Sequence, residues 1–229
     1  MNCILIPKLK NIISYLIPIV VERRKGEISP RLEIAIENGR YVLNTEHYNY
    51  SFGGLHRIFE KAFKKIKFSE RKVENVLVLG FGTGSVAELL LEEYEKDCKI
   101  TGVERDAVVI QLAHEYFKID RFKDLVIYHA DAHSFVKTCK EKFDLIIIDV
   151  FIGGRTPPHL EEEIFLEHIS RLLSANGMVL YNRAFFDGQS RKDTVLLAEK
   201  MNQLIGKTTL IKISAYGLSN AILVSEKID

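Results

Sequence analysis

A glycine-rich segment is the clearest candidate for ligand binding in this sequence. The segment Gly80-Phe-Gly-Thr-Gly84 directly follows an apolar run over residues 76–79. Glycines permit a tight turn and let a ligand lie against bare backbone, and the helix expected to follow offers unpaired N–H groups at its start. A purely structural turn can have the same composition, so the loop indicates ligand binding only in combination with other residues of the sequence.

Three carboxylates follow later apolar runs in the same way. Glu104 ends the next predicted strand, about 20 residues past the loop, where a carboxylate can accept both hydrogen bonds of a ribose diol. Asp131 and Asp149 end the third and fourth strands, and an acid at position 131 can accept from an exocyclic amine. Each acid alone could instead cap a helix, Asp131 in particular. Together with the glycines, they predict a nucleoside-type ligand.

NAD is the obvious competitor for such a site. The glycines here are spaced Gly-x-Gly-x-Gly, and Ser85 stands where the dinucleotide motif has its third glycine. We therefore rank NAD below an adenosyl-sulfonium cofactor.

The elements that must position these residues are those of an α/β fold. From residue 72 onward, apolar strands alternate with helical segments, which predicts a parallel, doubly wound, Rossmann-like sheet with ligands at the carboxyl ends of its strands. The last two strands, over residues 208–214 and 221–225, leave no room for a crossover helix and are expected to be antiparallel. The helix over residues 193–204 is expected to begin at an Asp193 cap.

The N-terminal quarter is predicted to be β structure. Alternating apolar residues flank Asn38-Gly39, a strong hairpin signal because both turn residues need positive φ. Prolines and lysines interrupt the apolar residues of the stretch 1–21, so neither a membrane span nor a signal peptide is expected there. We interpret this stretch as a folded strand. The domains expected are an N-terminal β domain over residues 1–54, a linking helix over 55–71 and a Rossmann-like domain over 72–229.

Composition narrows the function classes. The chain has 229 residues, 32 Lys and Arg against 31 Asp and Glu, and a net charge of +1, which argues against broad binding to nucleic acid or an anionic membrane. Three cysteines without metal-like spacing exclude a disulfide framework and a Cys-based zinc site, and they fit a reducing, cytoplasmic compartment. No metal site is expected. A small-molecule acceptor is the expected partner, and hairpin edges make a homodimer possible.

Four motifs of the chain resemble those of the class I S-adenosylmethionine-dependent methyltransferase superfamily. They are Val-Leu-Val-Leu-Gly-Phe-Gly-Thr-Gly, Gly-Val-Glu-Arg-Asp, Ala-Asp-Ala and Phe-Asp-Leu-Ile-Ile-Ile-Asp. Within it, the chain looks most like the spermidine synthase family, which joins a small N-terminal β domain through a helix to the same core. The resemblance implies that Glu104 holds the ribose, Asp131 meets the adenine amine and Asp149 deprotonates the acceptor. The cofactor-binding residues that it implies are Gly80, Gly82, Thr83, Gly84, Glu104, Asp131 and Ala132.

Two departures from the spermidine synthase pattern bear on the reaction. That family usually has an aspartate at the position of Thr83, and a second aspartate at that of Ile152. The chain lacks both and has Arg155 nearby, so a polycation is a poor substrate on charge alone, and a neutral or anionic acceptor fits better.

Asp149 is the best candidate for a general base, with helix capping or loop ordering as the structural alternative. Tyr50 and His56 flank two glycines in the linker and are weak acceptor-binding candidates, as is Arg155; core packing of the tyrosines and exposure of His56 are the alternatives. The sequence favours S-adenosylmethionine-dependent methyl transfer to a small molecule. Aminopropyl transfer from decarboxylated S-adenosylmethionine, with acids supplied by residues 161–163, is the second hypothesis, and a non-catalytic nucleoside-binding protein is the third.

Overall fold

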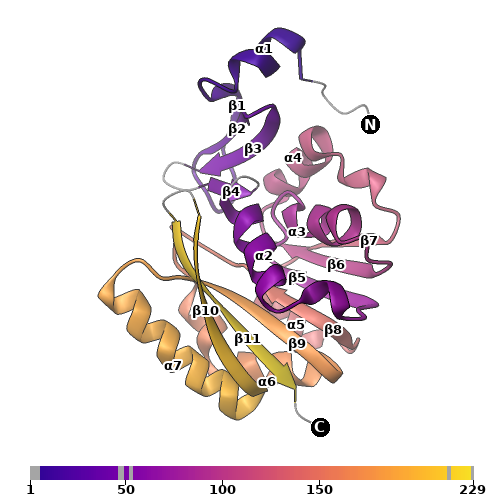
Figure 1. The fold of residues 1–229 in the computed structure, drawn as a ribbon, viewed down its shortest axis with the longest axis vertical. Helices are drawn as coiled ribbons and strands as arrows, with labels where there is room; N and C mark the ends of the chain where they lie inside the picture. The colour runs from indigo at the N-terminus through magenta and orange to yellow at the C-terminus, as the bar shows by residue number, and fades with distance from the viewer. Residues whose placement is uncertain (1–5, 46–48, 52–53, 216–217, 228–229) are drawn as a thin grey trace.

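The computed structural model describes residues 6–45, 49–51, 54–215 and 218–227 and contains two sheets (Figure 1). A four-stranded antiparallel sheet in the order β1-β2-β3-β4 lies at one end of the molecule, and a seven-stranded sheet in the order β10-β11-β9-β8-β5-β6-β7 forms its centre. The strands are β1 (Ile19–Arg24), β2 (Leu32–Glu37), β3 (Arg40–Thr45), β4 (Asn49–Ser51), β5 (Asn75–Leu79), β6 (Lys99–Glu104), β7 (Leu125–His129), β8 (Phe143–Ile148), β9 (Leu173–Ala184), β10 (Gly206–Ala215) and β11 (Leu218–Lys227).

The central sheet has the predicted doubly wound architecture. Strands β5 to β9 are mutually parallel, whereas β11 runs antiparallel to both β9 and β10. This confirms the fold class, including the antiparallel last pair, because the two residues between β10 and β11 leave no room for a crossover helix.

Both faces of the middle of the central sheet are covered, which explains the uninterrupted apolar runs of β5 and β8 at residues 76–79 and 145–148. In β5, Val76 and Val78 pack into one core with α2, α3, α4 and the N-terminal sheet, while Leu77 and Leu79 pack into a second core with α5, α6 and α7. The helices are α1 (Lys8–Ile13), α2 (Gly54–Lys65), η1 (Phe68–Glu70), α3 (Ser85–Glu88), η2 (Leu89–Glu93), α4 (Ala107–Phe117), η3 (Ile119–Arg121), α5 (Ala132–Thr138), η4 (Pro158–Glu161), α6 (Glu163–Leu172) and α7 (Gly188–Leu204).

The N-terminal sheet contains the predicted hairpin. Strands β2 and β3 pair in register around Asn38 and Gly39, whose φ angles are 50° and 77°, as a two-residue turn with positive φ requires. The sheet contacts α4, where Arg24 pairs with Glu115. This ion pair links the N-terminal sheet to a helix that covers the central sheet.

Two sequence predictions about local structure were wrong. Residues 1–21 were expected to form a strand, but in the described part of this stretch residues 8–13 form the short helix α1, and only residues 19–21 belong to a strand, β1. The predicted Asp193 cap lies inside α7, which instead begins after Asp187, whose carboxylate accepts the N–H of Ser190 in a reciprocal capping box. None of the described helices is long and apolar enough to cross a membrane.

Candidate functional site

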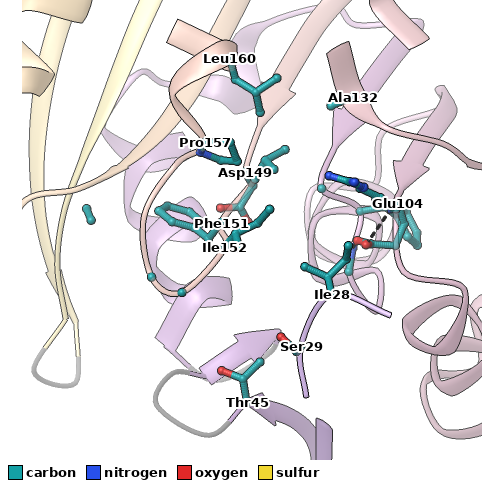
Figure 2. A pocket seen from close by; sticks show the side chains of 18 of the residues that line it. Ile28, Ser29, Thr45, Glu104, Ala132, Asp149, Phe151, Ile152, Pro157 and Leu160 are labelled. Carbon is teal, nitrogen blue, oxygen red and sulfur yellow. Dashed lines mark hydrogen bonds between the residues drawn. The ribbon is translucent and has the colours of Figure 1, made fainter. Parts of the chain in front are cut away.

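A pocket of about 690 Å³ lies at the carboxyl ends of the parallel strands, where the central sheet meets the N-terminal segment (Figure 2). In this view Asp149, Phe151 and Ile152 gather on one side, and Glu104 and Ala132 lie on the other. The carboxyl edge is where open α/β sheets place their ligands. The pocket walls come from loops after β5, β6, β7, β8 and β9, from β11 and from residues 28–31.

The glycine loop is bent as its composition predicts. Gly80 and Gly82 line the pocket with φ angles of 80° and 58°. A Cβ atom at Gly80 would overlap the carbonyl oxygen of Asp149, and the N–H of Asp149 donates to the carbonyl of Leu79 at 2.8 Å. The loop after β5 and the end of β8 therefore fit together only because position 80 has no side chain.

Glu104 is buried at the pocket wall, with 4% of its surface exposed. Its Oε2 accepts the N–H of Gly82 at 3.0 Å, and its Oε1 accepts those of Arg105 and Asp106 at 2.8 and 3.0 Å. Burial raises the pKa of the Glu104 carboxyl, while the three N–H donors act in the opposite direction. The geometry holds a carboxylate, an acceptor-only group when ionised, against the glycine loop.

Asp131 combines the two roles considered for it. Its Oδ1 caps α5 by accepting the N–H of Ser134 at 3.1 Å, and the residue also lines the pocket together with Ala132. The guanidinium of Arg105, another pocket residue, lies 3.7 Å from its Oδ2. The structure therefore brings Glu104, Asp131 and Ala132 to one side of the pocket, although capping accounts for part of the reason an aspartate stands at position 131.

Asp149 follows β8 directly and faces the same pocket. Its Oδ1 accepts the amide Nδ2 of Asn182 at 2.8 Å, and the Oδ1 of Asn182 in turn accepts Nδ2 of Asn220 at 2.8 Å. Burial raises the pKa of Asp149 to about 6, with the Glu104 carboxylate adding to the rise and the Asn182 hydrogen bond opposing it. A carboxyl that titrates near neutral pH suits general base catalysis.

Four other candidates from the sequence do not form the pocket wall. Thr83 is fully buried, and Gly84, with φ of 96°, precedes the first turn of α3; neither lines the pocket. His56 is buried and its Nε2 lies 2.7 Å from the Glu93 carboxylate. Arg155 is exposed and lies 3.8 Å from Asp187. The side chain of Tyr50 lies outside the described residues.

The sequence analysis missed several pocket residues. Residues 28–31 line the pocket because Asp106, 1% exposed, accepts the N–H of Ile28 at 3.0 Å. Asn220, which lines the pocket, was missed as well, as was Asn182, which binds Asp149 without lining the pocket. A buried amide within an apolar strand is nevertheless a usable signal, since it needs a polar partner. Phe186, at the end of the loop after β9, carries no such signal in the sequence.

A family model described as a methyltransferase domain matches residues 76–177. The polyamine aminopropyltransferase of Vibrio vulnificus is 34% identical over 114 residues, which are 48% of this chain and 38% of that protein. A tRNA1(Val) (adenine(37)-N6)-methyltransferase of Haemophilus influenzae is 26% identical over 172 residues, covering 68% of this chain and 74% of that protein. The chain therefore matches well under half of the length of the Vibrio aminopropyltransferase.

Solved structures resemble a larger part of the chain. A probable spermidine synthase from Corynebacterium glutamicum has a TM-score of 0.76 at 20% identity, over 90% of this chain and 80% of that one. The spermidine synthase from Thermotoga maritima has a TM-score of 0.71 at 18% identity, over 92% of this chain and 74% of that one. At such identities the likeness concerns the fold. The chain therefore has the fold seen in spermidine synthases, and residues 76–177 within it match the methyltransferase domain model.

Proposed function

We propose that this protein transfers a methyl group from S-adenosylmethionine to an uncharged small-molecule acceptor. The observation that carries the proposal is the division of the pocket by strand. The ends of β5, β6 and β7 supply Gly82, Glu104 and Asp131, whereas β8, β9 and β11 supply Asp149 with the amides that orient it. One side suits an adenosyl group, and the other suits removal of a proton.

The residues present fit the cofactor. The glycine at position 80 keeps the loop free of a side chain, Glu104 supplies carboxylate oxygens for a ribose diol, and Asp131 supplies one for an amine. Bound S-adenosylmethionine supplies an electrophilic methyl carbon and, after transfer, is left as a neutral thioether. Asp149 accepts the proton that the acceptor loses as its new bond to carbon forms.

The charges of the pocket favour methyl over aminopropyl transfer. Among the described lining residues the carboxylates are Glu104, Asp131 and Asp149, and a bound nucleoside would engage the first two. Residues 161–163, the alternative source of acids, do not line the pocket, and Glu161 pairs with the buried Arg183. A polyamine with two or more ammonium groups would find one carboxylate, so its desolvated charges would stay partly unpaired.

Aminopropyl transfer remains the second candidate, and the likeness to spermidine synthases and to the Vibrio aminopropyltransferase favours it. Because Thr83 is buried and does not line the pocket, that position gives less support to methyl transfer than the sequence alone suggested. Binding of a nucleoside without catalysis is the third candidate.

Calorimetric titration with intact and with decarboxylated S-adenosylmethionine separates these functions. We expect the intact compound to bind at least as tightly as the decarboxylated one, and we expect Glu104→Ala to weaken it about 10- to 100-fold, the usual value of hydrogen bonds to a charged group. Glu163→Ala is the matched control, since Glu163 is exposed outside the pocket.

A clear preference for the decarboxylated compound, followed by product formation with putrescine, would establish aminopropyl transfer instead. Binding of the intact compound without turnover over a broad set of acceptors would favour the non-catalytic protein.

A further inference from the structure

The wall beside Asp149 is built from large apolar side chains that remain open to the pocket. Phe151 and Ile152 follow β8 and Phe186 follows β9, and all three line the pocket. Ile152 is 43% exposed and Phe186 is 49% exposed. Pro157 and Leu160 extend the apolar wall, with Asp149 among them in Figure 2. Exposed apolar surface that lines a cavity indicates a binding site for an apolar molecule.

The polar groups on this side act together on one carboxylate. Asn220 donates to Asn182, and Asn182 donates to Oδ1 of Asp149. Within the part of the chain that the structure describes, no donor reaches Oδ2 of Asp149. The amide pair therefore orients the carboxylate through Oδ1 and leaves Oδ2 of this pocket-lining residue as a proton acceptor.

The charges on this side fit an uncharged ligand better than a polycation, because one carboxylate cannot pair with two or more ammonium groups. Asp149 is the one carboxylate among the described residues that line it, and the nearby Arg155 lies outside the wall, 3.8 Å from Asp187. Aliphatic amines are protonated at neutral pH, like lysine, whereas a phenol is neutral and has a proton of pKa near 10, like tyrosine. Methylation of a hydroxyl requires loss of that proton, which gives an oriented carboxylate a task, and phenylalanine walls favour a flat ring.

We infer that the part of the pocket between Asp149, Ile152 and Phe186 binds flat, uncharged phenols, with the hydroxyl directed at the carboxylate. This inference rests on the proposed function, because the other half of the pocket must hold the adenosyl group.

The test measures binding of 2-naphthol to protein saturated with S-adenosylhomocysteine, followed by naphthol fluorescence. Wild-type protein should bind it, and Ile152→Asp should weaken binding at least about tenfold, because the new carboxylate must be desolvated against the ring. Ile164→Asp is the matched control, at a residue 48% exposed and outside the pocket, and it should change the affinity less than about twofold.

A second variant tests the same site in case Ile152→Asp does not fold. Phe186→Ala should weaken 2-naphthol binding about three- to tenfold through loss of ring contact, with Leu196→Ala, 57% exposed on α7, as its control. The two pocket variants, Ile152→Asp and Phe186→Ala, should keep the wild-type affinity for S-adenosylhomocysteine.

Three results would overturn the inference. Equal 2-naphthol binding by wild type, Ile152→Asp and Phe186→Ala, or no binding while S-adenosylhomocysteine binds, would refute the phenol site and leave methyl transfer standing. Tighter binding of putrescine than of 2-naphthol would refute it in favour of a cationic acceptor. Failure to bind S-adenosylhomocysteine would overturn the proposed function itself.

Discussion

Replacing Asp149 by asparagine should stabilise the protein at neutral and alkaline pH, although it removes the proposed base. Burial raises the pKa of Asp149 from 3.8 to about 6. Between these two values the folded state binds more protons at this site than the unfolded state does, so the stability of the wild type falls as pH rises through this window. The amide of the Asp149→Asn variant would not ionise, and its carbonyl oxygen would still accept the hydrogen bond from Asn182.

The size of the effect follows from the two pKa values. The rise from 3.8 to about 6 corresponds to about 3 kcal/mol of unfolding free energy above pH 7. Because the side chain is partly exposed to the pocket, we expect about 2–3 kcal/mol. The difference between variant and wild type should shrink to about 0.5 kcal/mol at pH 4, where Asp149 is protonated in the folded state and about two-fifths protonated in the unfolded state.

Urea-induced unfolding of both proteins between pH 4 and pH 8 provides the measurement, since other titrating groups cancel in the difference. Asp187→Asn is a control of opposite sign: the hydrogen bond from Ser190 lowers the pKa of Asp187, so its contribution to stability is present at neutral pH and is lost as pH falls. An Asp149→Asn protein less stable than wild type at pH 8, or a difference that does not change with pH, would refute the reasoning.

The remaining predictions concern the loop and the amide that surround this carboxylate. Gly80→Ala should destabilise the protein by at least about 1–3 kcal/mol and weaken S-adenosylhomocysteine binding, because its Cβ would overlap the Asp149 carbonyl at a φ of 80°. The control Gly188→Ala, where a Cβ meets nothing within 4 Å, should leave stability and binding unchanged. Equal melting temperatures of the two variants would contradict this prediction. Asn182→Leu removes the hydrogen bond that lowers the pKa of Asp149, so the rising limb of kcat/KM against pH should move from a midpoint near 6 to higher pH, whereas Asp149→Asn should lose the limb; a limb unchanged in Asn182→Leu would show that another group produces it.

Local patterns in the sequence determined much of the fold. The Asn38-Gly39 turn and the bend at Gly80 were predictable because few residues other than glycine and asparagine adopt positive φ easily. The buried strand β5 was predictable because four consecutive apolar residues need cover on both faces. Since parallel strands end at one edge, the meeting of Glu104, Asp131 and Asp149 at one pocket also followed from the order of the strands.

Tertiary structure decided which neighbours each side chain has. Thr83 follows the pocket residue Gly82 and His56 lies three residues before the pocket residue Phe59, yet the first is buried away from the pocket and the second pairs with Glu93 on η2. The partner of Asp149, Asn182, is 33 residues away in the chain and meets it because β9 pairs with β8. Such contacts depend on long-range strand pairing, and no local periodicity encodes the packing between distant segments. For the same reason no local pattern indicated that residues 28–31 would form a wall of the pocket.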